Sequence, residues 1–254
     1  LAGGLSYHGE PIAAADALIG GLATIDGRNV VVGCEDFTVM GGSIGHATNA
    51  KKIRLASLAL QERLPFISLL EGSGERTSNA LSRHPYAPSD MQILAKLSGI
   101  VPTVALIVGP SAGHGAITGM LKDFIVMTSD ACLFAAGPPL VEAALGEKIS
   151  KQALGGAAMH TSVSGVAHNQ VDDFLQGVRL VRQYLSFFPA SAYELAADKQ
   201  SASSQSRSLV EVFDIVPNDD RIAYDMHKLI DLVVDDTDDC IEIQAGYGRS
   251  IITS

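Results

Sequence analysis

Short apolar runs alternate with helical patterns through the first two thirds of the chain. Two such runs, "LATI" and "NVVVGC", flank Asp26-Gly27, and an Asp-Gly pair between strand-like runs predicts a β-hairpin. The continuous apolar runs "LPFISLLE" and "VPTVALIVG" predict buried strands, and "FIVM" and "ACLFAA" predict two more. Because strands alternate with helical segments, we expect an α/β architecture with glycine loops clustered at one end of the strands.

Three helices are expected between these strands. The first is predicted to begin after Asn49 as its N-cap and to end near Arg63, and its broad apolar surface predicts that it is largely buried. A second is predicted to begin at Ser89 and to run through Leu97. A short third helix is expected at residues 116–121.

One long amphipathic helix is predicted from Gln170 onward. Pro189 is expected to end it, because proline cannot donate the next helical hydrogen bond. The prediction rests on apolar residues that recur at helical spacing: Val171, Phe174, Leu175, Val178, Val181, Leu185 and Phe188.

A polar, serine-rich stretch, "KQSASSQSRS", predicts a linker or exposed loop. Beyond it, "DDRIAYDMHKLIDLVV" predicts a helix, and "CIEIQAGYGRSIITS" predicts a strand, a turn and a strand. We therefore expect a first domain at 1–188, a linker at 189–208 and the incomplete beginning of a second domain at 209–254. Because the sequence has no initiator methionine, we expect a fragment or a processed product.

Composition narrows the class of protein. With 47% apolar and 18% charged residues among 254, the chain is typical of a globular protein. Its net charge of −10 argues against a nucleic-acid surface. It contains no apolar run near the roughly 20 residues of a membrane span and no basic segment of a signal peptide.

The chain's three cysteines, Cys34, Cys132 and Cys240, lie far apart. They form no C-x-x-C pair, which makes a zinc ribbon or a redox motif unexpected. Free thiols of this kind favour a reducing compartment, so we expect the cytoplasm, or the mitochondrial matrix in a eukaryote. The acidic run at 235–239 is more typical of a solvated helix end than of a cation site, and no metal site is predicted.

The stretch "GPSAGHGA" supports two different catalytic interpretations. Residues 109–113 satisfy the G-x-S-x-G nucleophile elbow with Ser111 as the attacking group, and Asp172 or Asp173 followed by His227 gives the required order of acid and histidine. Alternatively, the stretch is a glycine turn whose backbone N–H groups stabilise an oxyanion. The residues alone leave both interpretations open.

Several segments, in the same order, resemble the carboxyltransferase (β) subunits of biotin-dependent acyl-CoA carboxylases, such as propionyl-CoA and methylcrotonyl-CoA carboxylase. The resemblance extends over nearly the whole chain, and the Gly-Gly-Ala…His…SGVAH run is its most specific part. It rests on "DFTVMGGSIGHA" (36–47), "VGPSAGHGA" (108–116), "AAGPPLVEAALGEKIS" (135–150) and "ALGGAAMHTSVSGVAH" (153–168).

The resemblance implies a crotonase-like (ClpP-like) fold, a superhelix of β-β-α turns. Such subunits carry two homologous domains, of which the first mainly holds the CoA ester and the second mainly holds biotin. The active site lies between the first domain of one subunit and the second domain of its dimer partner. The implied partners are further copies of the chain, as dimers arranged in a hexamer, and a biotin carboxylase or biotin carboxyl carrier subunit.

The implied reaction transfers CO2 from carboxybiotin, carried on the partner, to the α (or vinylogous γ) carbon of an acyl-CoA through an enolate. The protein then supplies position and oxyanion stabilisation rather than an acid, a base or a nucleophile. By position, the oxyanion amides fall on Gly113 and His114. The resemblance places substrate-binding residues at Gly41, Gly42, Ser43, Gly74, Arg76, Gly137, Gly155 and Gly156.

Three positions depart from the family pattern. The family usually has cysteine where Ser111 stands and glycine where His114 stands, although a backbone N–H survives either change. In the loop "EGSGERT", Glu75 replaces a small residue, and an acid beside polyanionic CoA is unfavourable unless it turns outward. The alternatives are a biotin-dependent decarboxylase, a serine hydrolase using Ser111, or a non-catalytic subunit retained for assembly. The motifs mix propionyl/acetyl and methylcrotonyl/geranyl features.

Overall fold

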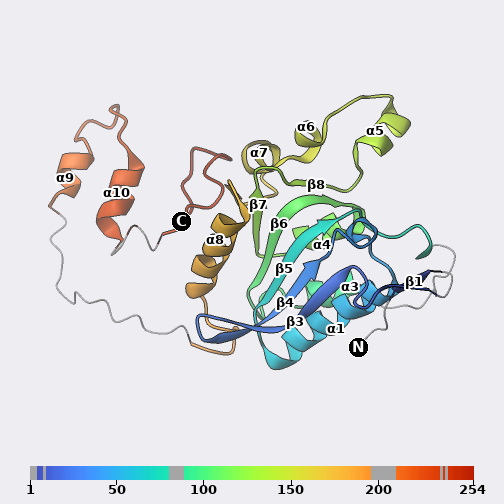
Figure 1. Cartoon of the computed structure of the whole chain (residues 1–254). Coiled ribbons are helices and arrows are strands. Elements are labelled where there is room, and N and C mark those ends of the chain that lie inside the picture. The colour runs from blue at the N-terminus through green and yellow to red at the C-terminus, as the bar shows by residue number, and fades with distance from the viewer. Residues whose placement is uncertain (1–4, 8–9, 80–88, 196–209, 235–236, 238–239) are drawn as a thin grey trace.

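The structure is a computed structural model, which describes residues 5–7, 10–79, 89–195, 210–234, 237 and 240–254. Within these residues the centre is a seven-stranded sheet in the order β3-β4-β5-β6-β7-β9, with β8 paired to β6 (Figure 1). Only β3 and β4 pair antiparallel in it. Its strands are β3 (Leu18–Ile25), β4 (Arg28–Glu35), β5 (Phe66–Gly72), β6 (Thr103–Ala112), β7 (Phe124–Thr128), β8 (Cys132–Phe134) and β9 (Asn169–Val171).

The predicted hairpin is confirmed. Strands β3 and β4 pair in register up to Ile25 and Arg28, and Asp26 and Gly27 form the turn with φ of 48° and 79°. Positive φ at both central residues is what a two-residue hairpin turn requires. A separate two-stranded ribbon precedes the hairpin, formed by β1 (Leu5–Tyr7) and β2 (Glu10–Ala13).

Helices cover both faces of the sheet. The first, α1 (His46–Glu62), begins earlier than predicted, because the N-cap is Gly45 and Asn49 already lies in the first turn. Its predicted end is confirmed by Arg63, the C-cap, in the left-handed conformation. The other regular helices as far as the sheet's last strand are α3 (Asp90–Ala95), α4 (Gly113–Met120), α5 (Pro138–Leu145), α6 (Lys151–Gly155) and α7 (Ala157–Met159), with short turns η1 (Met40–Gly42) and η2 (His160–Ser164).

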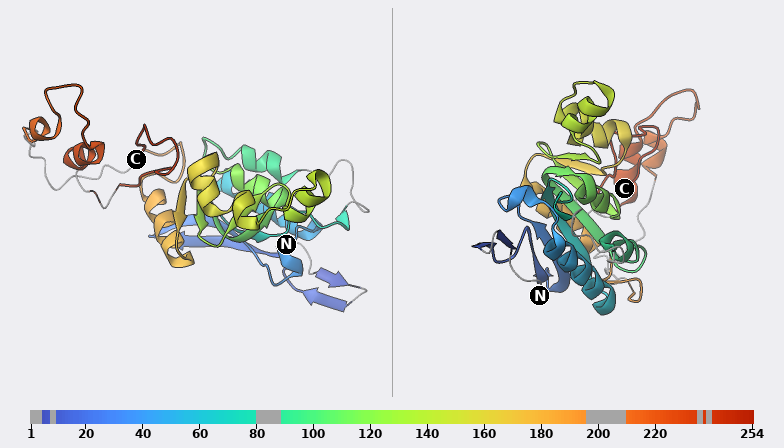
Figure 2. Two further views of the ribbon diagram at one scale, coloured as in Figure 1. Left: turned by 90° about the horizontal axis from the view of Figure 1, so that it is seen from above. Right: turned by 90° about the vertical axis from the view of Figure 1, so that its right-hand side faces the viewer.

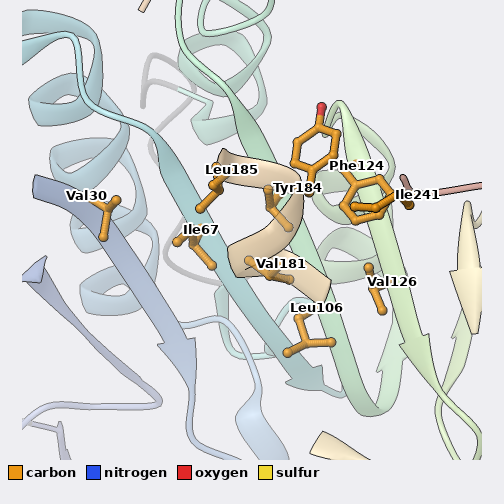
Figure 3. Packing of buried hydrophobic residues seen from close by; sticks show 10 residues of the cluster. Val30, Ile67, Leu106, Phe124, Val126, Val181, Tyr184, Leu185 and Ile241 are labelled. Carbon is orange, nitrogen blue, oxygen red and sulfur yellow. The ribbon is translucent and has the colours of Figure 1, made fainter. Parts of the chain in front are cut away.

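Successive side chains of the buried strands point to opposite faces of the sheet, so each face has its own hydrophobic cluster. On β6, Val104 and Leu106 join the cluster under α8 (Phe174–Ser186), whereas Ala105 and Ile107 join the cluster on the α4 side. This period of two is the expected geometry of a strand buried on both faces. Figure 3 shows the α8 side, where the ring of Tyr184 stacks on Phe124 with centroids 4.1 Å apart.

The long helix predicted from Gln170 is shorter than expected. Val171 belongs to β9, where it pairs with Thr128, and the helix starts only at Phe174. The start is set by Asp173, whose side chain accepts a hydrogen bond of 2.9 Å from the N–H of Gln176. An N-cap of this type satisfies a helix donor that has no partner within the helix.

The C-terminal part contains the predicted helix, α10 (Met226–Val233), preceded by the short α9 (Val212–Ile215). The predicted strands in 240–254 are not formed: this segment has no regular strand, and the N–H of Gln244 instead bonds the carbonyl of His168 at 2.9 Å. Ile241 is buried in the α8-side core, while α9 and α10 lie apart from the sheet (Figure 2). Of the predicted linker at 189–208, only residues 189–195 are among the described residues, and the division into domains stays a prediction.

The cysteines and the helices bear on the expected compartment. Cys132 is buried, Cys34 and Cys240 are half-buried, and all three thiols are free. In the portion of the chain that the structure describes, the helices are too short or too polar to cross a bilayer.

Candidate active site

The glycine loops meet at the carboxyl-terminal edge of the parallel strands, where α/β folds commonly bind ligands. The loop after β4 and the loop after β5 are joined by backbone hydrogen bonds, from the N–H of Ser73 to the carbonyl of Gly41 at 2.9 Å and from Ile44 to Gly74 at 2.8 Å. The turn between β6 and α4 lies at the same edge (Figure 1). The predicted residues 41–43, 74 and 113–114 are therefore brought together.

The turn at 112–114 has the geometry expected of an oxyanion site. Gly113 has a φ of 58° and opens α4 directly after β6, and the first N–H groups of a helix have no partner within it. They also lie at the positive end of the helix dipole. Gly113 and His114 are half-buried, so the first turn of α4 is not enclosed in the core.

The nucleophile elbow is not formed. Ser111 lies inside β6 with its side chain fully buried, and its Oγ has no hydrogen-bond partner among the described residues. His227 instead bonds Glu242, with Nε2 and Oε2 3.0 Å apart, and Asp173 caps α8. Because a nucleophile must be exposed and bonded to its base, the serine hydrolase prediction is wrong.

Arg76 is held inside the protein. Its Nη2 lies 3.0 Å from Oδ1 of Asp16, and its Nε donates to Oγ of Ser43 at 3.1 Å. Only 10% of the Arg76 side chain and 1% of that of Asp16 are exposed. Burial raises the pKa of Asp16, but hydrogen bonds from Arg76 and Thr48 outweigh it, so that the pKa lies below its ordinary value. The Arg76 guanidinium therefore connects the loop after β5 to Ser43 in the loop after β4 and to Asp16 before β3.

Two neighbouring positions bear on the predicted acyl-CoA side of the site. Gly42 has a φ of 66°, and a β-carbon there would clash with the carbonyl oxygen of Glu71. Gly41 is freer, because the nearest atom to its β-carbon position is Oγ of Ser73 at 3.4 Å. Glu75, the acid that departs from the family pattern, is exposed to solvent.

The other predicted glycines serve β8 and the helices after it. Gly137 is the N-cap of α5. A β-carbon on Gly155 would clash with the carbonyl oxygen of Leu133, and one on Gly156 with the side chain of Gln152. These close approaches explain the glycines by geometry, and their predicted contact with substrate stays a prediction.

A buried ion pair, which the sequence patterns did not predict, lies beneath the first turn of α4. Nζ of Lys52 is 2.7 Å from Oε1 of Glu35, and the other oxygen of Glu35 accepts the N–H of Glu71 at 3.0 Å. Oε1 of Glu35 lies 3.6 Å from the position that a β-carbon on Gly115 would occupy. The pair joins α1, β4 and β5 below the turn.

Lys122 is a second buried amine near this pair. Its Nζ has no hydrogen-bond partner in the described part of the chain and lies 4.2 Å from the ring centroid of Phe66. It lines a cavity of about 20 Å³ together with Lys52, Ser68 and Thr118, enough for a water molecule. Burial, and next the charge of Lys52, lower the pKa of Lys122 to about 7.

The side chain of His114 turns toward α3. Its Nε2 lies 2.6 Å from Oδ1 of Asp90, the first residue of that helix. Asp90 is fully buried, and sequence reasoning did not single it out. Among the described residues, no group of three or more His, Cys, Asp or Glu side chains is arranged to hold a metal ion.

Comparison with known proteins places nearly the whole chain in one family. Residues 5–254 match the family model described as "Carboxyl transferase domain". The crystal structure of transcarboxylase 12S, described as a hexamer assembly with methylmalonyl-coenzyme A and methylmalonic acid bound, superposes with a TM-score of 0.89 at 32% identity, covering 99% of this chain and 49% of that one. The fold is thus the crotonase-like α/β fold that the resemblance implied.

Two curated relatives with similar sequences are also carboxyltransferase or carboxylase subunits. The methylmalonyl-CoA carboxyltransferase 12S subunit of Propionibacterium freudenreichii is 33% identical over 245 residues, 96% of this chain and 46% of the relative. The mitochondrial propionyl-CoA carboxylase β chain of Rattus norvegicus is 33% identical over 239 residues, 93% of this chain and 44% of the relative. The chain belongs to the carboxyl transferase domain family, and it spans about half the length of these relatives.

Proposed function

We propose that this chain is the acyl-CoA side of the carboxyltransferase of a biotin-dependent acyl-CoA carboxylase. The observation that carries the proposal is the turn at 112–114, which presents two helix N-terminal amides beside a serine that is buried and unbonded. Biotin on a partner carrier, when bound, supplies the carboxyl group and the base. What remains for this chain is to hold the acyl-CoA and to stabilise charge.

The amides act on the thioester oxygen. Removing a proton from the α-carbon of an acyl-CoA places negative charge on this oxygen, and the N–H groups of Gly113 and His114 are preorganised to receive it at the start of α4. Loss of one such donor typically lowers the rate by about 10²–10³-fold. The close contact of Gly74 with Ala112 fixes the turn, so the donors need not reorganise during the reaction.

The substrate class that we propose is a short acyl-CoA of the propionyl/methylmalonyl type. The names of two relatives support it, because one is a methylmalonyl-CoA carboxyltransferase and the other a propionyl-CoA carboxylase. Glu75 is exposed, so its charge stays solvated rather than buried in the loop. Segment 135–150, which resembles the methylcrotonyl type, contains α5, and no residue of α5 is buried in the core.

The proposed assembly is a homo-oligomer of dimers arranged as a hexamer, working with a biotin carboxylase or carrier subunit. The support is the similarity to transcarboxylase 12S, whose structure is described as a hexamer assembly and multienzyme core. In this arrangement residues 1–188 form the acyl-CoA domain and 209–254 begin the domain that faces biotin. The proposed compartment is the cytoplasm, or the mitochondrial matrix in a eukaryote.

The test uses the full-length protein that carries this chain. It is incubated with methylmalonyl-CoA and free biotin, and the formation of propionyl-CoA is followed with and without biotin. We expect a biotin-dependent reaction, retained in Ser111→Ala. Propionyl-CoA binding without any transfer in either direction would contradict the enzyme and favour the assembly role.

A further inference from the structure

A buried hydrogen bond joins the proposed oxyanion turn to a different helix. Nε2 of His114, the second residue of α4, lies 2.6 Å from Oδ1 of Asp90, the first residue of α3. The Asp90 side chain is fully buried, and 19% of the His114 side chain is exposed. This N···O distance is slightly shorter than the roughly 2.7–2.9 Å typical of charge-assisted N–H···O bonds.

The bond is the principal stabilisation that the Asp90 carboxylate receives. Among the described residues its second oxygen, Oδ2, has no hydrogen-bond partner, and an unpaired buried carboxylate is costly. The amine of Lys122 adds a longer-range electrostatic interaction. When Asp90 is ionised, its carboxylate can only accept hydrogen bonds, and Nε2 of His114 is then the donor.

The ring is therefore fixed at one end by α3 and at the other by the first turn of α4. Gly74 packs against the same turn from another side, so closely that a β-carbon added at residue 74 would lie 2.8 Å from the carbonyl oxygen of Ala112. A helix start held from two sides keeps its first N–H groups in a constant direction. Such constancy is what electrostatic stabilisation of an oxyanion requires.

We propose that Asp90 and the His114 side chain form a positioning pair that aims the amides of residues 113 and 114 at the thioester oxygen of the acyl-CoA. The inference rests on the proposed function. In it His114 has two separate roles: its amide touches the substrate, and its imidazole acts only through the turn. Asp90 has no contact with substrate and is a positioning residue.

The experiment observes the thioester carbonyl itself. Propionyl-CoA labelled with ¹³C at the carbonyl is bound to the full-length protein, and isotope-edited infrared spectra record the carbonyl band relative to free propionyl-CoA. Saturating binding is established beforehand by calorimetry for each variant. In the wild-type protein we expect the band to move to lower frequency, because hydrogen bonding to the amides polarises the carbonyl. The readout requires neither biotin nor turnover.

Glutamine and asparagine at position 114 carry the same amide group but differ in side-chain length. His114→Gln places an N–H donor near the position of Nε2 and is expected to keep most of the band shift. His114→Asn is too short to reach Asp90 and is expected to lose more than half of it, with propionyl-CoA affinity changed less than threefold. Asp90→Ala is expected to behave like His114→Asn; if it does not fold, the His114 pair still decides.

The matched control is Asp123→Asn. Asp123 also uses one carboxylate oxygen in a partly buried network, accepting the N–H of Thr103 at 2.9 Å and its Oγ1 at 2.7 Å, but at the opposite end of β6. It is expected to lower stability without moving the carbonyl band. If His114→Asn kept the full wild-type shift, the positioning inference would be overturned and the proposed function would stand. If wild type bound propionyl-CoA without any shift, the proposed oxyanion site itself would be overturned.

Discussion

Gly74 touches the backbone of Ala112 so closely that a β-carbon on residue 74 would lie 2.8 Å from the carbonyl oxygen of Ala112. Gly74 also has a φ of 87°, which a residue with a side chain rarely adopts. The contact joins the loop after β5 to the turn after β6. The shape of the oxyanion turn thus depends on a residue almost forty positions earlier in the chain.

Gly74→Ala is predicted to lower both stability and substrate binding. The clash is with backbone, which cannot move aside cheaply, and strain at positive φ adds to it, so we expect a loss of about 2–4 kcal/mol in the free energy of unfolding. Gly99→Ala is the control, because Gly99 has a φ of 72° with no atom near its β-carbon position. It should show the strain alone and leave propionyl-CoA binding intact. Equal effects of the two substitutions would contradict the contact.

Arg76→Ala is predicted to be strongly destabilising, because it leaves the buried carboxylate of Asp16 without its cation. We expect a loss of about 3–5 kcal/mol in denaturant unfolding at neutral pH, and a smaller loss than the sum of the single changes when Asp16→Ala is combined with it. Arg182→Ala, which breaks an exposed pair with Asp26, should cost far less. A small effect of Arg76→Ala on the free energy of unfolding would contradict this pairing with Asp16. The guanidinium of Arg76 would then be available to a ligand.

Ser111→Ala is predicted to leave carboxyl transfer unchanged and stability unchanged or slightly raised. The substitution removes a buried hydroxyl that has no hydrogen-bond partner among the described residues, and a group of this kind contributes cost rather than stability. The assay is the biotin-dependent transfer, together with labelling by a fluorophosphonate. Labelling of the wild-type protein at Ser111 would contradict the structure.

Lys122 is predicted to make stability depend on pH. Its pKa is about 7 in the folded protein against an ordinary value of 10.5, so between these values the unfolded chain holds a proton that the folded protein has released. Stability therefore rises with pH across this window, by roughly 2 kcal/mol between pH 7 and 9. Below about pH 7 the amine is protonated in both states, and the full cost of burying a cation is present.

The variants Lys122→Met and Lys148→Met separate this effect from general charge. Lys122→Met should be more stable than wild type at pH 6, and the difference should shrink toward pH 9. Lys148 is 85% exposed, so its substitution should leave the pH profile parallel to that of the wild type. Chemical denaturation at several pH values measures both. Parallel profiles for Lys122→Met and the wild type would contradict a lowered pKa.

Much of the fold could be predicted because burial leaves a local pattern. The runs at β5 and β6 and the Asp26-Gly27 turn were recognisable from a few adjacent residues. The errors arose where a pattern was shared by two structures. Val171 continues the apolar spacing of α8, yet it pairs with β7, and the acid at Asp173 was the local signal of the true helix start.

The candidate site shows the same division. The glycine loops were predictable because positive φ and close backbone approach select glycine. Asp90 was not, because an acid after Ser89 is typical of the first turn of any helix, and its bond to His114 spans 24 positions. The alternating pattern "CIEIQ" predicted a strand, but the segment meets the start of β9 through single hydrogen bonds, from the N–H of Gln244 to the carbonyl of His168 and from Asn169 to the carbonyl of Glu242, and forms no ladder with it.

In the proposed reaction, backbone amides rather than side chains stabilise the charge that develops on the substrate. Replacing Gly113 by glycolic acid in the full-length protein converts its amide to an ester and removes only the N–H. We predict that kcat/KM for biotin-dependent carboxyl transfer falls by about 10²–10³-fold, with little change for the same replacement at the exposed Gly99. An ester at residue 113 that transferred carboxyl groups as fast as the wild-type protein would contradict the proposed oxyanion site.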